Sequence, residues 1–126
     1  MANILVVDDN DAICKSLAKL LDHAGHKGFC VTSGEDALQF VKHKMPDLMI
    51  LDVMMPGMDG LEVLRRLQSD EQTKKLPVVM FSAVTDEDYR RHVLGKGAID
   101  YWVKASVAFE DLENRLRKLL PKSPEC

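Results

Sequence analysis

The chain has 126 residues, of which 46% are hydrophobic and 29% charged, and its formal net charge is −3. This length suits one domain, so we expect residues 1–121 to form it, with 122–126 as a short polar tail and no fused output module. The acidic balance argues against direct nucleic-acid binding, which needs a basic surface. No apolar run approaches the ~20 residues that span a bilayer, so no membrane contact is expected.

The N-terminus and the cysteines bear on the compartment. A carboxylate pair, Asp8-Asp9, follows the first apolar run directly, and no basic segment precedes that run, so it is not a signal peptide. The three cysteines, Cys14, Cys30 and Cys126, are widely spaced and odd in number. They predict neither a metal site nor a disulfide framework, and Cys14 is expected to be a packed thiol. A cytoplasmic location is the resulting expectation.

Short apolar runs alternate with amphipathic stretches along the whole chain. Strands are expected at 4–7, 29–32, 48–51 and 78–81, with a fifth inside 99–103. Helices are expected at 11–24, from 34 to a point before Pro46, at 61–67, from 86 to near Gly95 or Gly97, and from 109 to Pro121. Such alternation predicts a parallel sheet with helices on both faces.

Two of these helices have a sequence signal at their start. Ser33 precedes Asp36 by three residues, and Thr85 precedes Asp88 in the same way. A hydroxyl residue followed three positions later by a carboxylate is typical of a capped helix N-terminus. We therefore expect Ser33 and Thr85 to be the capping residues.

Polar side chains follow four of the five predicted strands. Asp8 and Asp9 follow the first, Asp52 ends the third, Ser82 ends the fourth and Lys104 follows the fifth. Ligands of open α/β sheets bind beyond the carboxyl ends of the strands. The three carboxylates, the hydroxyl and the ammonium should therefore meet at one edge.

These residue types suit phosphoryl transfer. Clustered carboxylates repel one another unless a cation is present, and hard oxygen ligands favour Mg²⁺. A carboxylate can also accept a phosphoryl group and become an aspartyl phosphate. Lys104 and Mg²⁺ could neutralise the phosphoryl oxygens, and Ser82 could donate a hydrogen bond to one of them.

Each residue also has a simpler interpretation. An Asp-Asp pair after a strand often caps the next helix. Ser82 alone fits a cap or a turn, and Lys104 alone fits a solvated surface lysine. The joint placement at matching strand ends is what favours a functional site.

The motifs together resemble the receiver domains of response regulators in two-component signalling. They are Ile4-Leu5-Val6-Val7-Asp8-Asp9, Asp52-Val53-Met54-Met55-Pro56-Gly57-Met58-Asp59-Gly60, Ser82-Ala83, and Gly97-Ala98-Ile99-Asp100-Tyr101-Trp102-Val103-Lys104. The resemblance covers about residues 3 to 120. It implies a flavodoxin-like (βα)₅ fold, a doubly wound parallel five-stranded sheet in the order 2-1-3-4-5.

The resemblance also implies a role for each site residue. Asp52 matches the phosphoacceptor, which is also a metal ligand. Asp9 matches the direct Mg²⁺ ligand, Asp8 the second acidic residue, often acting through water, and the Met54 backbone carbonyl the third protein ligand.

Three further positions match the family's phosphoryl-binding and switch residues. Ser82 matches the hydroxyl that follows the phosphoryl group, and Lys104 the lysine that pairs with it. Tyr101 matches the aromatic switch residue.

The family's partners follow from the same resemblance. A histidine kinase or phosphotransfer protein donates the phosphoryl group, and a downstream protein target reads the switched surface. The domain catalyses its own phosphorylation and dephosphorylation without being a conventional enzyme. It is expected to be a monomer or a phosphorylation-linked homodimer.

One position departs from the family. A proline in a cis peptide bond usually follows the lysine, whereas Ala105 follows Lys104 here. A cis bond before alanine costs about 3–4 kcal/mol, so we expect a trans bond. The departure leaves open a second hypothesis, a protein-interaction module that works without phosphorylation. A phosphatase is disfavoured, because Met54 stands where such enzymes commonly place a second aspartate.

Overall fold

The computed structural model describes residues 2–104 and 109–119, in which five strands alternate with five helices. In chain order they are β1 (Asn3–Val7), α1 (Asp11–His23), β2 (Lys27–Val31), α2 (Gly34–His43), β3 (Leu48–Asp52), α3 (Gly60–Gln68), β4 (Val78–Ser82), α4 (Glu87–Leu94), β5 (Asp100–Val103) and α5 (Phe109–Leu119). The predicted stop at Pro121 and the polar tail 122–126 lie outside the described residues.

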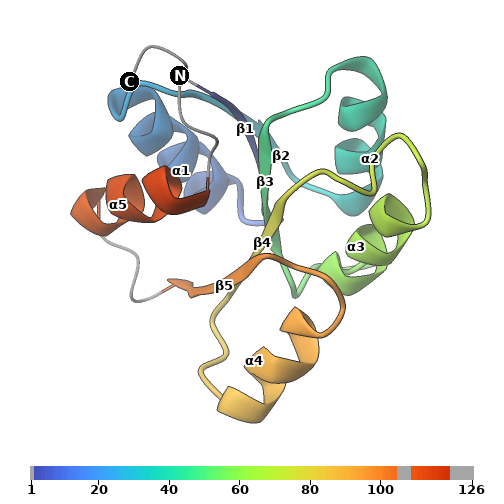
Figure 1. Cartoon of the computed structure of the whole chain (residues 1–126). Helices are drawn as coiled ribbons and strands as arrows, with labels where there is room; N and C mark the ends of the chain where they lie inside the picture. The colour runs from blue at the N-terminus through green and yellow to red at the C-terminus, as the bar shows by residue number, and fades with distance from the viewer. Residues whose placement is uncertain (1, 105–108, 120–126) are drawn as a thin grey trace.

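The five strands form one parallel sheet in the order β2-β1-β3-β4-β5 (Figure 1). The predicted flavodoxin-like α/β fold and strand order are thereby confirmed. Val7 pairs with Leu51, and Ser82 pairs with Val103, so the carboxyl ends of the inner strands align. The residues that follow these strands therefore emerge at one edge of the sheet.

Helices cover both faces, α1 and α5 on one and α2, α3 and α4 on the other (Figure 1). Successive strand side chains point to opposite faces, so each strand supplies both cores. On β1, Leu5 and Val7 belong to the α2–α4 side, whereas Ile4 and Val6 pack with α1 and α5. Burial on both faces explains why the central strands are nearly continuous apolar runs.

Strand β2 begins two residues earlier than predicted, at Lys27, and includes Gly28. A Cβ at Gly28 would lie 2.8 Å from the Cα of Ala18 on α1, closer than side chains approach backbone. Glycine at this position thus allows α1 to pack closely on the sheet.

The two predicted helix caps have different outcomes. Ser33 caps α2, its hydroxyl accepting a hydrogen bond from the Asp36 backbone at 3.1 Å. The prediction for Thr85 is wrong, because Asp86 caps α4 and accepts from the Asp88 backbone at 3.1 Å. The helix begins one residue later than predicted because aspartate caps a helix as well as threonine does.

The prediction that the cysteines form no disulfide is also wrong. Cys14 on α1 and Cys30 on β2 are joined by a disulfide, with their Cα atoms 5.7 Å apart. The pairing arises from the packing of α1 on β2, which cysteine spacing does not reveal. Because two of the cysteines are paired, cysteine usage no longer supports the expectation of a reducing compartment. In the described part of the chain, none of the helices has the length and apolar character needed to cross a membrane.

Candidate functional site

The ends of four strands bring together the side chains singled out in the sequence. Asp8 is fully buried just after β1, Asp52 is 2% exposed at the end of β3, and Ser82 is fully buried at the end of β4. Asp9 is exposed, and Lys104 after β5 is partly buried. The site therefore has buried carboxylates beneath one carboxylate open to solvent.

The three carboxylates form a compact cluster, with one oxygen from each of Asp8, Asp9 and Asp52 within 4.8 Å of the others. Oδ1 of Asp8 accepts a hydrogen bond from the Asn10 backbone at 2.9 Å, and Oδ1 of Asp52 accepts from the Met54 backbone at 3.2 Å. The Oδ2 atoms of Asp8 and Asp52 are buried, and their polar partner among the described residues is the Lys104 ammonium.

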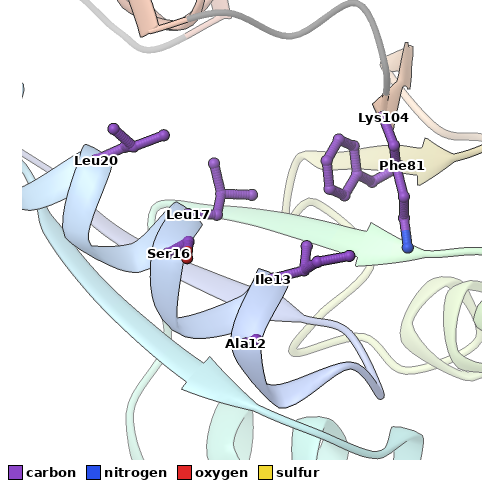
Figure 2. A pocket seen from close by; sticks show the side chains of 7 residues that line it. All are labelled: Ala12, Ile13, Ser16, Leu17, Leu20, Phe81 and Lys104. Atoms are coloured by element: carbon purple, nitrogen blue, oxygen red, sulfur yellow. The ribbon is translucent and has the colours of Figure 1, made fainter.

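Lys104 is the cation that faces these buried oxygens. Its ammonium lies 2.8 Å from Oδ2 of Asp8 and 3.4 Å from Oδ2 of Asp52. Figure 2 shows its side chain running beside Phe81, whose ring centroid is 5.4 Å from the ammonium. Lys104 is therefore held in the site and is not a solvated surface lysine.

A groove of about 260 Å³ adjoins the site through Lys104. It runs along α1, as Figure 2 shows, and its lining residues are Ala12, Ile13, Ser16, Leu17, Leu20, Phe81 and Lys104. Its walls are mainly apolar, and Ile13 is among the few exposed large hydrophobic side chains of the described chain.

The carboxylates and the lysine shift one another's protonation. Burial, together with the Asp8 charge, raises the pKa of Asp52 to about 7, although the Lys104 charge and the Met54 backbone hydrogen bond act to lower it. For Lys104, burial favours a lower pKa, but the ion pair with Asp8 and the Asp52 charge outweigh it and raise the pKa. Near neutral pH, the site without a metal holds a proton that a cation could replace.

The capping interpretation of the carboxylates does not hold. Asn10 caps α1, its side chain accepting from the Ile13 backbone at 3.1 Å, so neither Asp8 nor Asp9 performs that task. Ser82 is not a helix cap either, since Asp86 caps α4. The Ser82 hydroxyl accepts from the Val84 backbone at 3.1 Å, which is a turn contact.

The loop between β3 and α3 fixes Asp52 through Gly60, a residue the sequence analysis quoted without a role. The Gly60 backbone donates to the Val53 carbonyl at 2.9 Å. A Cβ at Gly60 would collide with the Asp52 carbonyl oxygen, so only glycine fits there. Asp59 caps α3 beside it. In the sequence, the Asp59-Gly60 pair directly before an amphipathic helix is the pattern that could have indicated this tight turn.

Met54 and Tyr101 occupy different surroundings. The Met54 side chain is 65% exposed, so it is the backbone of this residue that belongs to the site. Tyr101 is only 5% exposed, and its hydroxyl donates to the Val84 carbonyl at 2.8 Å. The backbone of Val84 thus contacts both hydroxyls, its N–H bonding Ser82 and its carbonyl bonding Tyr101. The predicted trans bond between Lys104 and Ala105 lies outside the described residues.

The donor set fits a divalent cation with hard oxygen ligands. Three clustered carboxylates share a single ammonium, that of Lys104, and exposed Asp9 leaves a path for a hydrated ion. Asp8, Asp9 and Asp52 are the residues that could hold it.

A sequence model of the response regulator receiver domain matches residues 4–117. Among curated proteins, the transcriptional regulatory protein AfsQ1 of Streptomyces coelicolor is 39% identical over 120 residues, which are 95% of this chain and 52% of that protein. The chain spans about half the length of the curated relatives it matches.

Solved structures give the same likeness. A putative response regulator from Chloroflexus aurantiacus superposes with a TM-score of 0.88 at 33% identity, covering 96% of this chain and 98% of that one. The BeF3-activated N-terminal receiver domain of RstA from Klebsiella pneumoniae has a TM-score of 0.86 at 27% identity, covering 95% of this chain and 99% of that one. The acidic cluster at the strand ends is typical of receiver metal sites.

Proposed function

Because this chain belongs to the response regulator receiver family of two-component systems, we propose that it accepts a phosphoryl group on Asp52. The observation that carries this proposal is the position of Asp52. Its carboxylate is buried beside two further carboxylates and lies 3.4 Å from the Lys104 ammonium. A nucleophile held against a fixed cation suits phosphoryl transfer, which depends on positioning and charge neutralisation.

The reaction balances without a further co-reactant. A carboxylate oxygen of Asp52 forms a bond to phosphorus, and the phosphorus–nitrogen bond of a phosphohistidine breaks. The electron pair of that bond stays on the departing imidazole. Lys104 stabilises the charge on the phosphoryl oxygens, and Ser82 exchanges its contact with the Val84 backbone for one with a phosphoryl oxygen.

We further propose that the resident cation is Mg²⁺, held by Asp9, Asp52 and the Met54 carbonyl, with Asp8 acting through water. When bound, Mg²⁺ supplies positive charge to the attacking carboxylate and the phosphoryl oxygens. Supporting this assignment, one oxygen from each of Asp8, Asp9 and Asp52 lies within 4.8 Å of the others, and the Lys104 ammonium contacts the two buried carboxylates. Lys104 alone cannot neutralise three carboxylates.

The proposal extends to partners in the pathway. A histidine kinase or phosphotransfer protein donates the phosphoryl group, and a downstream protein reads a surface that changes near α4 and β5. The chain acts as a monomer or a phosphorylation-linked homodimer, without direct contact with nucleic acid or membrane. A cytoplasmic location goes with this partner class.

The test is incubation with a small phosphodonor and Mg²⁺, followed by intact mass. The wild type should gain the mass of one phosphoryl group, and Asp52→Ala should gain none. Asp11→Asn is the matched control, because Asp11 is an exposed carboxylate near the site that pairs with Lys15 at 2.9 Å. It should be modified like the wild type. No adduct on the wild type, or an equal adduct on Asp52→Ala, would end the proposal.

A second candidate is an interaction module that works without phosphorylation. One observation favours it: Tyr101, the proposed switch residue, is buried while the Ser82 hydroxyl contacts the Val84 backbone. Partner binding that is equal with and without Mg²⁺ and phosphodonor would favour this candidate.

A further inference from the structure

The hydroxyls of Ser82 and Tyr101 are connected through the backbone of one residue, Val84. The Val84 backbone N–H donates to Ser82 Oγ at 3.1 Å, and its carbonyl accepts from the Tyr101 hydroxyl at 2.8 Å. Because both contacts use the same residue, the position of the Tyr101 ring depends on the backbone that follows Ser82. Tyr101 therefore occupies its buried, inward position while the Ser82 hydroxyl accepts a hydrogen bond from the Val84 backbone.

A second aromatic ring, that of Tyr89 on α4, packs against Tyr101. Tyr89 lies edge-on to Tyr101, with ring centroids 6.4 Å apart and an interplanar angle of 80°. Such an arrangement places the positive ring edge against the negative ring face and is favourable beyond the area it buries. Tyr89 is partly buried and packs against the core cluster that includes Tyr101 and Val93.

The tyrosine pair lies within the field of the acidic site. Burial raises the pKa of Tyr89, and the charges of Tyr101, Asp59 and Asp52 raise it further. The Tyr89 hydroxyl therefore stays neutral at physiological pH, and its ring packs against Tyr101 without a competing charge.

We propose that Tyr89 is a positioning residue that holds Tyr101 inward before any phosphoryl group is attached. The consequence rests on the proposed function: if the α4 and β5 surface is what partners read, this receiver presents part of its active surface while Asp52 is unmodified. Phosphorylation then increases an inward population that already exists.

The expected size of the effect follows from the strength of aromatic pairs. Removing the Tyr89 ring should lower the ratio of inward to outward Tyr101 by roughly two- to tenfold. Keeping the ring without its hydroxyl, as in Tyr89→Phe, should leave the ratio unchanged, because the proposal assigns the effect to the ring.

The composition makes this measurable, since Tyr89 and Tyr101 are the two tyrosines of the chain. Biosynthetic labelling with 3-fluorotyrosine therefore places a single fluorine probe, at Tyr101, in both Tyr89→Phe and Tyr89→Leu. The ¹⁹F resonance and its H₂O/D₂O solvent shift report how far the ring is exposed. Thermal melting confirms that both variants are folded.

Without phosphodonor, Tyr101 should be shielded from solvent in Tyr89→Phe and measurably more exposed in Tyr89→Leu. Beryllium fluoride with Mg²⁺ should return the Tyr89→Leu resonance toward the shielded position. Equal exposure in the two variants, or an exposed ring in Tyr89→Phe, would overturn the role of Tyr89. A difference between the unmodified variants with no response to beryllium fluoride would support Tyr89 and contradict the function proposed for Asp52.

Discussion

The Lys104 ammonium lies 2.8 Å from Oδ2 of Asp8, although β5 and β1 are separated in the sheet by β3 and β4. This contact spans the carboxyl edge of the sheet and passes next to Asp52, 3.4 Å from the same ammonium. One cation thus serves two buried carboxylates that repel each other. Lys104 therefore both stabilises the buried carboxylates and lies beside the proposed phosphoacceptor.

Replacing Lys104 with methionine should destabilise the protein when no metal is present. The buried Asp8 and Asp52 would then face each other without a cation, so the free energy of unfolding should fall by about 1–3 kcal/mol. Chemical denaturation in EDTA measures it. Lys15→Met is the control, because Lys15 pairs with exposed Asp11 and should contribute less than about 1 kcal/mol. An equal decrease in the free energy of unfolding of both variants would show that the Lys104 contacts stabilise the protein no more than an exposed ion pair does.

Mg²⁺ should bind the wild type and bind Asp9→Asn at least roughly tenfold more weakly, since a neutral amide is a poorer ligand than a carboxylate. Asp9 is exposed, so its replacement leaves the packing intact. Isothermal titration calorimetry compares the affinities, with Asp11→Asn as the control. Saturating Mg²⁺ should also raise the melting temperature of the wild type more than that of Asp9→Asn. Unchanged affinity in Asp9→Asn would remove Asp9 from the metal site.

Stability without metal should fall as pH rises from about 4 to 7. The pKa of Asp52 is raised to about 7 by burial and by Asp8, so the folded state holds a proton that the unfolded chain releases. The free energy of unfolding therefore declines across this window, by up to a few kcal/mol, since one pKa unit is worth about 1.4 kcal/mol.

Asp52→Asn has no ionisable group at this position and should show a flatter profile in EDTA. Denaturation series at several pH values provide the comparison, with Asp11→Asn following the wild type. Parallel profiles for the wild type and Asp52→Asn would contradict the raised pKa.

The Cys14–Cys30 disulfide should be visible by counting thiols. The chain contains three cysteines, so alkylation of the denatured, unreduced protein should modify one, and alkylation after reduction should modify three. Because the bond closes a loop with a sequence separation of 16, reduction should lower the free energy of unfolding by roughly 3 kcal/mol. Three alkylated cysteines without reduction would mean that the bond is not formed in solution.

The strand ends and their charged residues could be predicted from the sequence because the signals are local. Apolar runs mark the strands, and Asp52 or Lys104 follows directly where a run stops. The parallel topology then brings these residues together without further information. The capping residue of α1 was harder, since Asp8, Asp9 and Asn10 are all competent caps and only the geometry selects Asn10.

Contacts between distant elements were beyond the sequence. The disulfide depends on how α1 packs on β2, and the tyrosine pair depends on how α4 lies against β5. That Lys104 bridges two buried carboxylates likewise becomes apparent only when burial is known. These features have no period or spacing by which a pattern could indicate them.

The central claim is that Asp52 itself becomes the aspartyl phosphate. Treating the protein with a small phosphodonor and Mg²⁺, then reducing with borohydride, converts an aspartyl phosphate to homoserine, which peptide mass spectrometry locates by residue. We predict homoserine at position 52, dependent on Mg²⁺ and absent without phosphodonor. Homoserine at position 8 or 9 with aspartate intact at 52, or no homoserine at all, would contradict the account.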